Sequence, residues 1–136
     1  MNKPEEIKQI IDEHKVIAVV GLSSNPMRPS HGVAQYMQRK GYKVVPVNPM
    51  ETMVLGEKCY AKLSDIPVKI DLVNIFRRSE EAGKIVGEAI EIGAKSVWLQ
   101  EGVIDEVAVK RAENADLIAV MDLCWLKEHY RFNSKK

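Results

Sequence analysis

Several residue types are scarce in this chain of 136 residues, which has two cysteines, three histidines and 6% aromatic residues. Two cysteines, Cys59 and Cys124, are too few for a disulfide framework and lack the spacing of metal ligands. No apolar run approaches the ~18 residues that a membrane-spanning helix requires. The N-terminus also lacks the apolar segment of a secretory signal. We therefore expect a cytoplasmic protein that binds neither a metal nor a membrane.

An excess of charge of one sign is also missing, because the formal net charge is +1. Such a chain has no global field that would recruit nucleic acid, so a bound anion must be held by a local cluster of donors. The length and the 46% hydrophobic content favour one domain over residues 1–136.

Five short apolar runs rich in valine and isoleucine are present, at residues 16–20, 43–47, 71–75, 97–99 and 117–121. Runs that do not alternate with polar residues are typical of strands buried on both faces of a parallel sheet. Segments with helical periodicity separate them. The pattern predicts an α/β fold, a doubly wound Rossmann-like parallel sheet of about five strands in the order 3-2-1-4-5.

Helix boundary signals support this alternation. Pro4 lies in the first turn of the first helix, and Ser30 and Ser79 are candidate N-caps of the second and third. Asp105 is expected to cap a fourth helix, and a last helix precedes a polar tail at residues 133–136.

The long segment 51–67 is irregular and predicts no clear element. In a doubly wound sheet, ligands bind at the carboxyl ends of the strands, beside the point where the strand order reverses. We expect that point between the first and fourth strands, so the loops after the strands are where binding residues should lie.

The loop after the first strand carries donors suited to phosphate. Gly21 allows the backbone to approach a ligand closely, and Ser30 opens a helix whose N-terminal amides attract anions. Hydroxyls of Ser23 and Ser24 and the guanidinium of Arg28 add donors. The loop has neither the later glycines of a dinucleotide fingerprint nor the Gly-Lys-Ser/Thr of a P-loop. A polar connection with an exposed arginine is the alternative.

The second strand ends in Asn48-Pro49. NAD-binding Rossmann domains usually place a carboxylate here to bond the ribose hydroxyls. The uncharged Asn48 lacks that acceptor strength but tolerates a nearby phosphate. A simple turn is the alternative.

The third and fourth strands end in Phe76-Arg77-Arg78 and in a segment containing Gln100 and Gly102. Adjacent arginines before a helix form a second anion-binding cluster, and we expect at least one, Arg77 ahead of Arg78, to face the ligand. Phe76 could pack against an adenine or a pantetheine arm. Gln100 and the Gly102 backbone should line the same crevice. The alternative places both arginines on the surface and Phe76 in the core.

No nucleophile paired with a base is evident in the sequence. The histidines His14, His31 and His129 show no ligand spacing, and no serine has the G-x-S-x-G context of a hydrolase. We therefore expect no catalysis by this chain alone. Asp122 is a candidate cap for the last helix.

Four ordered motifs, at residues 21–30, 46–49, 76–78 and 98–102, together resemble the small stand-alone CoA-binding domain proteins. The similarity runs over residues 7–130. That family is similar to the CoA-binding N-terminal domain of the succinyl-CoA synthetase alpha subunit and of NDP-forming acyl-CoA synthetases. In those enzymes the phosphorylated histidine belongs to a following domain, which this chain does not match, so the resemblance does not imply ligase activity.

The resemblance implies coenzyme A or a short acyl-CoA as the ligand, with a protein partner left unidentified. The implied contacts are Gly21, Ser23, Ser24, Arg28, Ser30, Asn48, Pro49, Phe76, Arg77, Arg78, Gln100 and Gly102. Two other functions stay open: an NAD-binding redox regulator or oxidoreductase, and the CoA-binding subunit of a split acyl-CoA ligase. Cys124 is either an inert buried thiol or one that forms a mixed disulfide with the CoA thiol.

Overall fold

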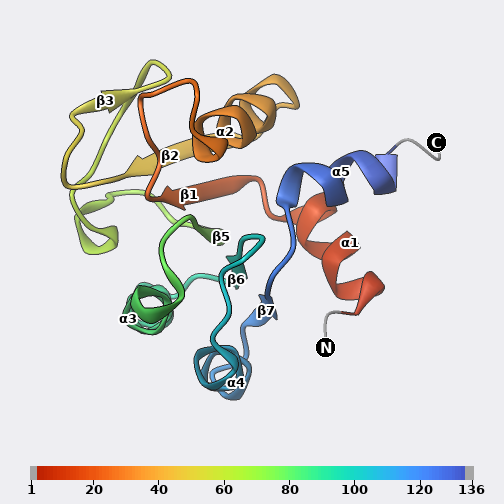
Figure 1. Ribbon diagram of the computed structural model, residues 1–136. Coiled ribbons are helices and arrows are strands. Elements are labelled where there is room, and N and C mark those ends of the chain that lie inside the picture. The colour runs from red at the N-terminus through yellow and green to blue at the C-terminus, as the bar shows by residue number, and fades with distance from the viewer. Residues whose placement is uncertain (1–2, 134–136) are drawn as a thin grey trace.

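A computed structural model describes residues 3–133 and has a five-stranded parallel sheet at its centre (Figure 1). The strands are β1 (Val16–Val20), β2 (Lys43–Val47), β5 (Leu72–Ile75), β6 (Ser96–Leu99) and β7 (Ile118–Val120). All four pairings between neighbours are parallel. The predicted fold class is therefore confirmed.

Helices cover both faces of the sheet (Figure 1). The helices α1 (Pro4–Glu13), α2 (Pro29–Arg39) and α5 (Trp125–Asn133) pack on one face, where Trp98 and Trp125 are fully buried. The helices α3 (Ser79–Glu91) and α4 (Glu106–Asn114) pack on the other face. No helix within residues 3–133 is both long and apolar enough to cross a membrane.

The strand order requires a correction. It is β2-β1-β5-β6-β7, so the third long strand, β5, pairs with β1 instead of lying outside β2. The outer edge of β2 is occupied by Tyr60, which forms a parallel bridge with Val47. Pro46 in β2 already favoured an edge position, because proline cannot donate to a ladder. The strand order thus reverses between β1 and β5, not between the first and fourth strands.

The irregular segment contains short elements that the sequence did not predict. Met53–Val54 (β3) and Glu57–Lys58 (β4) form an antiparallel pair, and Leu63–Asp65 is a short 3₁₀ helix. The polar tail was predicted at residues 133–136, of which 134–136 lie outside the described residues.

Asp105 caps its helix as predicted, since its carboxylate accepts a hydrogen bond from the Ala108 amide at 3.0 Å. Ser30 and Ser79 do not act as N-caps, because the cap positions are occupied by Arg28, two residues before Ser30, and by Arg78, one residue before Ser79. Pro29 fixes the first turn of α2 instead. The two serine hydroxyls are thereby free to bond neighbouring loops.

His14 ends α1 and joins it to the sheet, with Nδ1 2.7 Å from the Ser96 hydroxyl. Burial of the ring lowers the pKa of His14 below 6.5, with a smaller lowering effect from Lys95 that Asp71 and Glu13 oppose. The folded protein therefore holds this imidazole neutral.

We predict that the free energy of unfolding decreases as the pH falls below 6.5. The reason is that His14 then binds a proton in the unfolded state but stays unprotonated in the folded state. Above pH 6.5 His14 is mostly neutral in both states, so its effect on the free energy of unfolding no longer changes with pH. One such proton accounts for up to about 1.4 kcal/mol per pH unit. Urea denaturation at several pH values between 7.5 and 5.5 measures the slope. His14→Gln should reduce it and His31→Gln should not; equal slopes in the wild type and His14→Gln would contradict the prediction.

Candidate functional site

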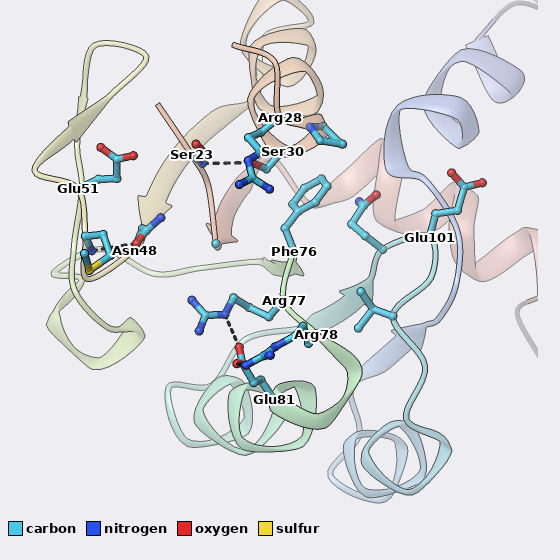
Figure 2. Close-up of a pocket in the computed structure, with 15 residues that line it drawn as sticks. Ser23, Arg28, Ser30, Asn48, Glu51, Phe76, Arg77, Arg78, Glu81 and Glu101 are labelled. Carbon is cyan, nitrogen blue, oxygen red and sulfur yellow. Dashed lines mark hydrogen bonds and ion pairs between the residues drawn. The ribbon is translucent and has the colours of Figure 1, made fainter. Parts of the chain in front are cut away.

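A pocket of about 700 Å³ lies at the carboxyl ends of the central strands (Figure 2). Its walls come from the loop after β1, the segment after β2, the β5–α3 junction and the residues after β6. This volume is in the range of small-molecule sites. The corrected strand order puts the pocket beside the β1/β5 reversal, where doubly wound sheets bind ligands.

Nine of the twelve predicted site residues line this pocket: Gly21, Ser23, Arg28, Ser30, Asn48, Phe76, Arg77, Arg78 and Gln100. Ser24, Pro49 and Gly102 are not among the lining residues. The Gly102 amide is already used, since it donates to Asp122 Oδ1 at 2.7 Å. Asp122 therefore bonds the loop after β6, a contact that the sequence did not predict.

Six lining residues were not predicted: Pro29, Met50, Glu51, Glu81, Glu101 and Val103. Glu81 had a readable signal, because it stands four residues after Arg77 and three after Arg78 at the start of a helix. Glu51 had none, because its position depends on how the irregular segment folds.

Gly21 is where three strand ends meet. Its amide donates to the Val47 carbonyl at 2.8 Å, and its φ of +87° is one that residues with a Cβ rarely adopt. A Cβ on Gly21 would lie 2.2 Å from the Phe76 carbonyl oxygen and 3.0 Å from Arg77 Cδ. The close approach of the first loop to the β5–α3 junction therefore requires glycine.

The loop after β1 is held by its own serines. The Ser23 amide donates to the Ser30 hydroxyl at 3.1 Å, and the Asn25 amide donates to the Ser23 hydroxyl at 3.0 Å. Ser30 is buried. The Arg28 guanidinium lines the pocket and, within residues 3–133, has no hydrogen-bond or ion-pair partner (Figure 2). This cation is available to a ligand.

The second predicted anion cluster carries its own counter-ion. Arg77 Nε donates to Glu81 Oε1 at 2.6 Å, and Arg78 Nη2 donates to Glu81 Oε2 at 2.9 Å (Figure 2). Hydrogen bonds from Arg78 and then Arg77 lower the pKa of Glu81, and the same carboxylate raises the pKa of Arg78. Both arginines line the pocket, Arg78 as well as Arg77.

Glu51 joins the loop after β1 to the segment after β2. Its Oε2 accepts hydrogen bonds from the Ser24 amide at 2.9 Å and the Ser24 hydroxyl at 2.8 Å. The amide bond and then the hydroxyl bond lower the pKa of Glu51. The first loop and the segment after β2 are thereby connected by an ionised carboxylate.

Asn48 is both a turn residue and a pocket residue. Its Oδ1 accepts from the Met50 amide at 2.9 Å, and its Nδ2 donates to the Leu22 carbonyl at 3.0 Å. The first bond forms an Asx turn and the second fixes the first loop. Its polar atoms thus have protein partners, and no carboxylate occupies the end of β2.

Across the described residues, no group of three or more histidine, cysteine, aspartate or glutamate side chains could hold a metal ion.

Comparison with known proteins gives the site a context. A model of the CoA-binding domain matches residues 15–130. The chain is also 43% identical to protein YneT of Bacillus subtilis over 119 residues, which cover 88% of each chain.

This chain belongs to the CoA-binding domain family. The resemblance found in its strand-end motifs is therefore confirmed. The chain is also similar to the alpha subunit of ADP-forming acetate–CoA ligase II from Pyrococcus furiosus, with 34% identity over 82 residues. The match covers 60% of this chain but only 18% of that subunit.

A solved structure has the same fold as this chain. The crystal structure of Prb, a PH1109 protein redesigned for binding, superposes with a TM-score of 0.96 at 40% identity and covers 100% of this chain and 96% of that one.

Replacing Gly21 by alanine should destabilise the protein by at least about 1–2 kcal/mol through backbone strain, and further through the clash with the Phe76 carbonyl. Gly41→Ala is a matched control, because Gly41 has a φ of +91° and a Cβ added there would meet nothing within 4 Å. Urea denaturation of both variants separates strain from clash. Equal losses would show that the approach to Phe76 is not a constraint.

Proposed function

We propose that this chain binds coenzyme A, or a short acyl-CoA, in the 700 Å³ pocket and performs no catalysis alone. The observation that carries the proposal is the placement of two cationic helix starts, Arg28 before α2 and Arg77-Arg78 before α3, on one pocket. Helix N-termini and guanidinium groups both favour phosphate. Coenzyme A carries a diphosphate and a separate 3′-phosphate, which suits two such clusters.

Further features of the pocket favour this ligand over NAD. A ribose-binding carboxylate at the end of β2 is replaced by Asn48, whose amide is engaged with Leu22 and Met50. Phe76 offers an apolar ring beside the arginines, which fits an adenine or the pantetheine arm. Family membership supports the same ligand class.

A role as the CoA-binding subunit of a split acyl-CoA ligase is the second candidate. It is favoured by the similarity to a named ligase alpha subunit, of which the matching segment is 18%. Under this proposal the catalytic groups would come from a partner chain, and the pocket described above would keep its CoA-binding role.

Calorimetric titration with CoA, acetyl-CoA, NAD and ATP tests the ligand. CoA or acetyl-CoA should bind more tightly than NAD, because the separated cationic clusters match separated phosphates and Asn48 offers the ribose no charge. Equal or tighter binding of NAD would remove the CoA proposal and favour the redox alternative.

Arg28→Ala and Arg77→Ala should each weaken CoA binding by about 1–3 kcal/mol, the worth of a hydrogen bond to a charged group. Arg77 must share its guanidinium with Glu81, so its loss should be the smaller of the two. The exposed Arg39, at the far end of α2, gives a matched control that should leave the affinity unchanged. Dephospho-CoA, which lacks the 3′-phosphate, shows which arginine contacts that group. Replacing the arginine that contacts the 3′-phosphate should leave the affinity for dephospho-CoA unchanged. A variant with wild-type affinity would place its arginine outside the site.

A further inference from the structure

A second cavity, of about 230 Å³, adjoins the main pocket. It is lined by Pro29, Val33, Phe76, Gln100, Glu101 and Cys124. Four of these, all except Val33 and Cys124, also line the main pocket. The two cavities therefore adjoin at these four residues. We call the second cavity the annex.

Cys124 contributes a thiol to the wall of this annex. It is a free, partly exposed cysteine between β7 and α5. Cys59 differs from it in burial. Cys59 is buried, its sulfur donates to the Asn48 carbonyl at 3.4 Å, and burial raises the pKa of its thiol.

Gln100 offers a ligand in the annex a hydrogen-bond acceptor. It is only 3% exposed, and its Nε2 donates to Asn74 Oδ1 at 2.9 Å. Its Oε1 has no hydrogen-bond partner within residues 3–133, although the side chain lines both cavities. Because this side chain lines both cavities, its acceptor is open to an N–H donor of a ligand.

We infer that the annex receives the thiol end of the pantetheine arm and that Cys124 exchanges disulfides with it. This inference rests on the proposed binding of CoA. The arm ends in an amide, two methylene groups and a sulfur, so an N–H donor for Gln100 lies close to the sulfur. The apolar walls of Pro29, Val33 and Phe76 suit the methylene groups.

The reaction is a thiol–disulfide exchange with CoA disulfide as the oxidant. The Cys124 thiolate attacks one sulfur of CoA disulfide, so that a Cys124–CoA disulfide bond forms and the sulfur–sulfur bond of the reagent breaks. One CoA leaves as a thiolate and takes up the proton that Cys124 has lost. A second thiol reverses the step and restores both free thiols.

Incubating the wild-type protein with CoA disulfide, followed by intact mass and peptide mapping, tests the inference. One CoA per chain should appear on Cys124, and its rate should exceed that with cystamine by roughly tenfold, because the nucleotide positions the disulfide. Cys124→Ser should abolish the adduct and Cys59→Ser should retain it. Gln100→Met should slow the reaction with CoA disulfide but not with cystamine.

Calorimetry with reduced CoA separates this inference from the proposed function. Reversible CoA binding with no adduct overturns the exchange and leaves the binding proposal intact, whereas no CoA binding at all removes both. An adduct on Cys59, or equal rates with CoA disulfide and cystamine, also overturns the inference. Peptide mapping of the wild-type protein gives this answer even if a variant fails to fold.

Discussion

The contact between Gly21 and the Phe76 carbonyl oxygen sets the geometry of the whole site. A side chain at Gly21 would collide with that oxygen, so the first loop can rest on the β5–α3 junction only without a Cβ. This contact exists because β1 and β5 are neighbours. It brings Arg28 and Arg77 to one pocket although they are distant in sequence. Their cationic groups can then act on one ligand.

Local pattern was sufficient to predict the strands but not their order. The runs at 16–20 and 43–47 match β1 and β2 residue for residue, because strands buried on both faces are continuously apolar. Alternative doubly wound orders have the same alternation of elements, so periodicity cannot choose between them. Pro46 does distinguish between these orders. Proline has no amide hydrogen, so Pro46 fits an edge strand and argues against the interior place that the predicted order gave to the second strand.

The site was predictable where chemistry follows strand ends and unpredictable where it depends on irregular chain. The arginines and Gln100 were found because they directly follow strands or belong to helix starts. The carboxylates were missed. Glu81 balances two arginines, and Glu51 bonds a serine twenty-seven residues away. The positive charge of Arg77 and Arg78 at the pocket is therefore partly neutralised within the protein itself.

The bridge between Val47 and Tyr60 also has a consequence for association. An exposed edge strand is a template for pairing with another chain. At the outer edge of β2, the Tyr60 amide donates to the Pro46 carbonyl at 3.0 Å and the Asn48 amide donates to the Tyr60 carbonyl at 2.9 Å. Pro46 itself has no amide hydrogen to offer. The same irregular segment that supplies Glu51 to the pocket therefore occupies the pairing groups at the carboxyl end of β2, where another chain could otherwise add a strand.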